Sequence, residues 1–135
     1  MIRRAAAIAV SAMLTSTAAV SAHHSIAGMY DSTRQATVDG IIIRFDFVNP
    51  HPFVWVEVRS GTAVEAWQLE LDNRRELSDI GFSADTLRPG DRIVAAGSPA
   101  RRETHRMYVR RLDRPADGFG YEQVGTRPRL RAPAR

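Results

Sequence analysis

The chain has 135 residues, 19 basic and 15 acidic side chains, a net charge of +4 and no cysteine. This length suits one small domain, and the lack of cysteine excludes disulfide bonds and thiolate chemistry. The positive charge does not predict nucleic-acid binding, because residues 23–113 carry 12 arginines against 13 acidic residues, while residues 114–135 carry five arginines against two.

The first 22 residues have the composition of a secretory signal peptide. Two arginines precede a mostly apolar run from Ala5 to Leu14, and Val20-Ser21-Ala22 forms a small-residue cleavage site. The run is too short to span a bilayer, which requires about 20 apolar residues. We therefore expect a bacterial periplasmic or secreted protein, with no membrane span after cleavage and with His23 as its first residue.

The next clear element is a strand over residues 36–48. Apolar residues alternate there, which predicts that one side of a half-buried strand faces the core. That side carries Ile41, Ile43, Phe45 and Phe47. Residues 49–52, Asn-Pro-His-Pro, then predict a compact loop, because proline donates no backbone hydrogen bond.

Two further strands are predicted over residues 53–59 and 63–72. In the first of them, three valines alternate with Phe53, Trp55 and Glu57. If the valines face the core, both aromatic rings lie on the outer surface. These rings therefore form a candidate face for a ligand or a partner.

A helix and two more strands complete the predicted domain. Asn73 suits a helix N-cap and Gly81 a helix C-terminus, so residues 73–81 are expected to be helical. Residues 92–98 and 106–112 again alternate as strands. Residues 114–135 are rich in proline, glycine and arginine, and we expect a flexible basic tail there.

The order of three strands, one helix and two strands is that of the OB fold, a five-stranded barrel. The sequence therefore predicts a mainly β, OB-like domain over residues 23–113. Ligands of this fold usually bind on strands two and three and on the loop between strands one and two. In this chain these elements carry Phe53, Trp55 and the loop of residues 49–52. The fold alone fixes no function.

Several short motifs occur in one order along the chain. They are Ala22-His23-His24-Ser25, Asn49-Pro50-His51, Trp67 with Glu70, and Leu87-Arg88-Pro89-Gly90-Asp91. With these motifs the chain resembles, from His23 to about Leu112, the exported bacterial family catalogued as domain of unknown function 6152. The resemblance implies export and the fold, and it implies no activity.

The histidines suggest a metal site. After cleavage, His23 offers its free amine and its imidazole, and His24 adds a second ring. Imidazole nitrogen suits copper, zinc or nickel. His51 can complete a three-point site if the N-terminal segment folds back beside its loop. No cofactor is required by the sequence, and copper is the candidate. His51 can equally serve only as a hydrogen-bonding residue of a rigid loop.

Two functions therefore compete. One is a binding or accessory module that uses Phe53 and Trp55 to contact an envelope protein or a small ligand. The other is a copper-binding or copper-handling protein built on His23, His24 and His51. We do not predict an enzyme, because the sequence contains no cysteine nucleophile, no G-x-S-x-G elbow, no P-loop and no dinucleotide fingerprint. Oxidative catalysis at the copper is a distant third hypothesis.

Overall fold

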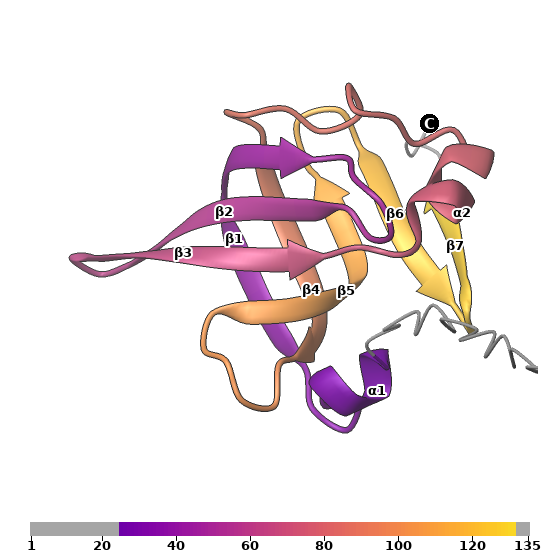
Figure 1. Ribbon diagram of the computed structural model, residues 1–135. Helices are drawn as coiled ribbons and strands as arrows, with labels where there is room; N and C mark the ends of the chain where they lie inside the picture. Colours follow the sequence, from indigo (N-terminus) through magenta and orange to yellow (C-terminus); the bar gives the residue numbers. More distant parts are fainter. Residues whose placement is uncertain (1–24, 132–135) are drawn as a thin grey trace, which may run out of the picture.

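Figure 1 shows the computed structural model, which describes residues 25–131. The predicted signal peptide, residues 1–22, lies outside the described residues, as do His23, His24 and residues 132–135. Within residues 25–131, no helix is long and apolar enough to cross a membrane.

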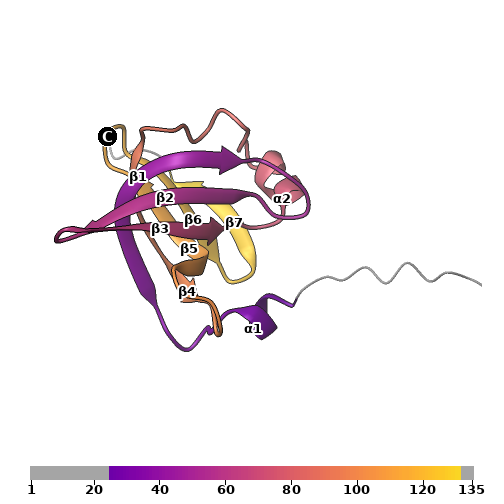
Figure 2. The same ribbon diagram turned by 60° about the vertical axis from the view of Figure 1, so that its left-hand side comes forward.

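The described chain folds into a barrel with one added hairpin (Figures 1 and 2). In chain order the elements are α1 (Ile26–Met29), β1 (Ala36–Asp46), β2 (Phe53–Ser60), β3 (Ala63–Glu70), α2 (Arg74–Asp79), β4 (Arg92–Pro99), β5 (Arg106–Arg114), β6 (Phe119–Val124) and β7 (Arg127–Arg131). The strand order is β3-β2-β1-β4-β5-β6-β7, and a parallel pairing of β3 with β5 closes the first five strands. This closure and order confirm the OB-like prediction.

The barrel encloses one apolar core. Val54 and Val56 of β2 are fully buried, as the alternation predicted. The helix prediction is confirmed as well, because the Asn73 side chain accepts a hydrogen bond from the Arg75 amide at 2.9 Å and Leu77 is buried beneath α2. The apolar faces of strands and helix thus meet in a single cluster.

The prediction for the inward side of β1 is wrong in its first half. Ile41 and Ile43 are 41% and 49% exposed, whereas Ile42 is 1% exposed. The register between β1 and β2 shifts between Ile42 and Arg44. A bulge inserts one residue and reverses which side chains face the core, so Phe45 packs inward although it lies three positions after Ile42.

The prediction of a flexible tail after residue 113 is wrong for the part that the structure describes. Residues 119–131 form the β6–β7 hairpin, which extends the sheet from β5. Tyr121 faces the core and is fully buried. The carboxylate of Glu122 pairs with Arg129 across the hairpin at 2.5 Å. One buried aromatic ring and cross-strand charge pairs therefore order a segment whose composition is typical of loops.

The N-terminal segment crosses the end of the barrel next to β4 and β5. The Ser25 side chain caps α1, and Tyr30 then forms a bridge with Ala100. The Asp31 amide donates to the Pro99 carbonyl at 2.9 Å. In both ribbon views α1 lies at the lower end of the barrel, away from α2 (Figures 1 and 2). The segment is thus held by backbone pairing before β1 begins.

Candidate functional site

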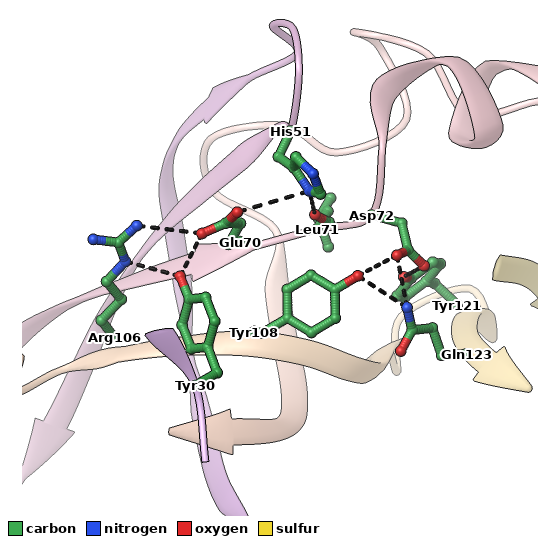
Figure 3. A network of polar contacts seen from close by, with 9 residues as sticks. All are labelled: Tyr30, His51, Glu70, Leu71, Asp72, Arg106, Tyr108, Tyr121 and Gln123. Atoms are coloured by element: carbon green, nitrogen blue, oxygen red, sulfur yellow. Dashed lines mark hydrogen bonds and ion pairs between the residues drawn. The ribbon is translucent and has the colours of Figure 1, made fainter. Parts of the chain in front are cut away.

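The end of β3 places two carboxylates inside the protein. Glu70 and Asp72 are two positions apart, so they project to the same side of the extended chain. They are only 6% and 5% exposed. A buried carboxylate is stable only when charged or hydrogen-bonding groups surround it. Figure 3 shows that each carboxylate has its own set of partners.

The first set, which we call the Glu70 cluster, consists of Glu70, Tyr30, Arg106 and His51. Glu70 Oε2 accepts a short hydrogen bond from the Tyr30 hydroxyl and a second one from Arg106 at 3.2 Å. Arg106 also donates to the Tyr30 oxygen at 2.9 Å. Tyr30 comes from the N-terminal segment and Arg106 from β5. The cluster therefore ties the N-terminal segment to the barrel.

The environment of this cluster keeps its donors protonated. Burial raises the pKa of the Tyr30 hydroxyl well above its usual range, and its hydrogen bond to the Glu70 carboxylate adds to the shift. Burial lowers the pKa of Arg106, but hydrogen bonds to Glu103, Tyr30 and Glu70 and the charge near it outweigh this effect and raise the pKa overall. Tyr30 is a neutral donor at physiological pH, and Arg106 keeps its charge.

The second set, the Asp72 cluster, consists of Asp72, Tyr108, Tyr121 and Gln123. Asp72 Oδ1 accepts a short hydrogen bond from the Tyr108 hydroxyl and another from Gln123 at 2.6 Å, and Oδ2 accepts one from the Tyr121 hydroxyl at 2.8 Å. Burial raises the pKa of both tyrosines far above the usual range, and the Asp72 carboxylate adds to both shifts. Three neutral donors thus satisfy one buried charge.

His51 lies at the edge of the Glu70 cluster. Its Nδ1 is 2.8 Å from the Leu71 carbonyl oxygen and 3.7 Å from Glu70 Oε1. A carbonyl oxygen can only accept, so Nδ1 carries a hydrogen, and in the tautomer with one ring hydrogen the lone pair is on Nε2. The loop is fixed by two further hydrogen bonds, from the Leu71 amide to Pro52 and from the Arg74 amide to Pro50. The ring is therefore oriented and is 22% exposed.

The two aromatic residues that the sequence suggested as a ligand face are only partly exposed. Phe53 and Trp55 point away from the core valines of β2, and both are half-buried. The Phe53 ring lies 6.0 Å from the Arg106 guanidinium. The indole Nε1 of Trp55 is buried and has no hydrogen-bond partner within residues 25–131. Phe53 thus borders the Glu70 cluster.

A cavity of about 320 Å³ opens between α1 and the Asp72 cluster. Its wall includes Tyr30, Asp72, Tyr108, Arg110 and Gln123, with Ile26 and Ala27 of α1 on the apolar side. The Tyr108 ring lies between the two clusters, 5.7 Å from the Tyr30 ring and 6.5 Å from the His51 ring. The cavity and the two clusters together form the candidate functional site.

Of the predicted metal ligands, the structure describes only His51. No group of three or more histidine, cysteine or acidic side chains within residues 25–131 is placed to hold a metal ion. His105 lies elsewhere, with Nε2 3.4 Å from Glu65 and its ring 5.3 Å from the Trp67 ring. A metal site at His51 therefore depends on ligands outside the described residues.

Sequence reasoning missed most of this site. The contributions of Tyr30, Asp72, Tyr108, Tyr121 and Gln123 were not predicted, and Glu70 was noted only as a motif residue. One signal was present: the chain contains three tyrosines, and all three donate to these two carboxylates. The contacts join residues 36 to 49 positions apart, so no local pattern could reveal them.

The fold and the site define a small OB-like barrel with two buried carboxylate clusters at one end. Residues 10–108 match a family described as a family of unknown function, DUF6152. Because the match covers more than half of the chain, the protein belongs to this family. The match ends at Tyr108, before the β6–β7 hairpin that supplies two of the Asp72 partners. Among the curated proteins, none matches the sequence.

Two solved structures are similar to parts of the chain. One is the mitochondrial single-stranded DNA-binding protein Rim1 from S. cerevisiae, with 11% identity, a TM-score of 0.46 and coverage of 59% of this chain and 91% of that one. The other is the ZRD-deleted mutant of TiaS in complex with agmatine, with 12% identity, a TM-score of 0.44 and coverage of 62% and 22%. Similarity at this level bears on neither ligand nor activity.

Proposed function

We propose that this protein is an exported, periplasmic binding module that holds a copper ion between its mature N-terminus and His51. In this proposal His23 supplies its amine and its imidazole, and His51 supplies Nε2. His24 is a further nitrogen donor beside them. The observation that carries the proposal is the orientation of His51, whose Nδ1 hydrogen is bound to the Leu71 carbonyl at 2.8 Å.

This orientation is typical of a metal-binding histidine. In such residues the ring nitrogen that does not bind the metal donates its hydrogen to a carbonyl or a carboxylate. This hydrogen bond fixes the ring and makes the other nitrogen a stronger ligand. Here the acceptor is a carbonyl, and Glu70 Oε1 lies 3.7 Å from the same nitrogen. Neutral imidazole nitrogen suits Cu²⁺. The fixed orientation of the ring therefore supports His51 as a copper ligand.

The position of Tyr30 supports the second half of the proposal. Tyr30 follows His23 by seven positions and donates to Glu70, the carboxylate next to His51. The proposal requires the N-terminal segment to fold back beside the His51 loop, and the Tyr30–Glu70 hydrogen bond supports this requirement for Tyr30. Export supplies the other requirement, because only cleavage after Ala22 frees the His23 amine.

The test is a copper titration of the exported protein after its first residue has been identified by mass spectrometry. We expect one-to-one binding at submicromolar concentration, with a spectrum of several nitrogen ligands. His51→Ala should weaken binding at least tenfold, about 1.4 kcal/mol. His105→Ala is the matched control and should leave the affinity unchanged. Equal affinities for all three proteins would remove His51 from the site.

An added glycine tests the terminal chelate separately. One residue placed before His23 moves the amine away from the first imidazole, so the copper spectrum should change and the affinity should fall. The fold should be unaffected, because the addition lies outside residues 25–131. If the copper spectrum is the same with and without the added glycine, the amine is not a ligand.

The second candidate function is contact with an envelope partner through Phe53 and Trp55. It is favoured by the half-buried positions of Phe53 and Trp55 on the side of β2 opposite the core valines. In this case Trp55→Phe should abolish crosslinking of the protein to a partner in intact cells while copper binding stays unchanged. Loss of copper binding alone, with crosslinking retained, would exclude this function for Trp55.

A further inference from the structure

We propose a second binding site, separate from His51, in which Arg110 and Arg34 hold a phosphate-type oxyanion. The site is a cavity of about 300 Å³ that adjoins the cavity at α1. Ser32, Ser98 and Arg110 line both cavities, and Arg34 lines only the second of them. The second cavity has no carboxylate in its wall, so its two arginines give it a positive charge.

Arg110 differs from the other half-buried arginines of β5. Arg106 pairs with Glu70 and Glu103, and Arg114 pairs with Asp91 and Asp117. Arg110 forms no ion pair within residues 25–131. A partly buried guanidinium without a counterion is unfavourable, and a bound anion removes this cost.

The side chain of Arg110 is nevertheless held in place. One of its terminal nitrogens donates to the Gln123 carbonyl oxygen, and its guanidinium lies 4.9 Å from the centre of the Tyr108 ring. Gln123 in turn donates to Asp72. The Asp72 cluster therefore positions Arg110 through Gln123, while Asp72 itself is satisfied by its own three donors. The remaining guanidinium hydrogens are available for an anion.

Ser98 supplies the second observation. It is 4% exposed as a residue and lines both cavities, so its hydroxyl can donate to an anion bound there. Together, Ser32, Ser98 and the two arginines offer more donors than the two oxygens of a carboxylate can use. A phosphate group has enough oxygens to accept them.

The experiment titrates metal-free protein with inorganic phosphate at low salt and follows backbone and arginine side-chain NMR signals. We expect saturable one-to-one binding, with shifts centred on Ser32, Ser98 and Arg110. Arg110→Gln should weaken binding at least tenfold. Arg34→Gln should weaken it several-fold and should leave the fold intact, because Arg34 is exposed and forms no ion pair in the described part of the chain.

Arg111→Gln is the matched control. Arg111 is the next residue of β5, is exposed, and pairs with Asp113 at 2.7 Å. The Arg111→Gln variant loses the same charge as Arg110→Gln, and its affinity for phosphate should stay within twofold of that of the wild type. Equal losses in all three variants would mean non-specific attraction and would overturn the proposal, as would a titration without saturation.

Vesicles identify the source of the phosphate. Binding to phosphatidylglycerol vesicles, but not to phosphatidylcholine vesicles, that disappears in Arg110→Gln would assign the site to a lipid headgroup. Arg110-dependent binding of free phosphate without vesicle binding would assign it to a soluble phosphate compound. Because the protein is metal-free, failure here leaves the copper proposal untouched, and failure of copper binding leaves this one untouched.

Discussion

Glu70 and Asp72 are equally buried and lie two positions apart, yet the groups that satisfy them differ in kind. Glu70 pairs with a charged guanidinium and one tyrosine, and His51 beside it is partly open to solvent. Asp72 has three neutral donors, two of which come from the β6–β7 hairpin. One carboxylate thus binds the N-terminal segment and the other binds the C-terminal hairpin.

The difference shows which cluster is structural and which is available for function. The Asp72 carboxylate already accepts hydrogen bonds from three donors within the fold, which occupy most of its acceptor sites. The Glu70 cluster holds a segment whose α1 buries no residue of its own, and it borders an oriented histidine. We infer that the Asp72 cluster stabilises the barrel, whereas the Glu70 cluster can open and close locally without unfolding it.

The largest expected effect follows from Asp72→Ala. This change leaves the buried donors of Tyr108, Tyr121 and Gln123 without their acceptor. We expect the free energy of unfolding to fall by about 3–5 kcal/mol. Chemical denaturation followed by fluorescence measures it. Asp79→Ala, at an exposed position of α2, should change stability by less than about 0.5 kcal/mol. Similar results for both variants would refute a structural role for the cluster.

Alkaline pH should act on the same clusters through the tyrosines. Their pKa values in the folded protein lie above the unfolded value of about 10, so folding favours the protonated form. Their contribution to stability is complete below about pH 10 and is lost as pH rises further. Each tyrosine should remove about 1.4 kcal/mol per pH unit beyond that value, or about 4 kcal/mol for all three.

Absorbance at 295 nm against pH, with denaturation curves at each pH, checks this prediction. No tyrosinate should form before the protein unfolds. Tyr30→Phe should remove about a third of the slope, and Tyr108→Phe with Tyr121→Phe about two-thirds. Tyrosine ionisation near pH 10 in the folded protein would contradict the buried clusters.

The barrel was predictable because its signals are local. Alternating valines in β2, the cap at Asn73 and the order of strands and helix are all visible within short windows of sequence. The inward side of β1 was not predictable, because a bulge between Ile42 and Arg44 reverses the alternation. Nothing in the composition of the strand indicates this bulge. The β6–β7 hairpin was missed for a related reason: its order depends on Tyr121 reaching Asp72, 49 positions away.

The smallest effect should come from Tyr30→Phe, and it separates the two clusters most sharply. The change removes one hydrogen bond to Glu70 and one acceptor for Arg106, so we expect a global loss of only about 1–2 kcal/mol. Amide hydrogen exchange should nevertheless become faster for residues 28–31, whose amides bond to residues 25, 26 and 99.

Tyr121→Phe is the matched variant, and it should accelerate exchange in β5 and β6 while leaving residues 28–31 protected. If Tyr30→Phe also weakens copper binding, docking of the N-terminal segment is coupled to the metal site. If both variants loosen the same amides, the two clusters form one cooperative unit, and the division drawn between them is wrong.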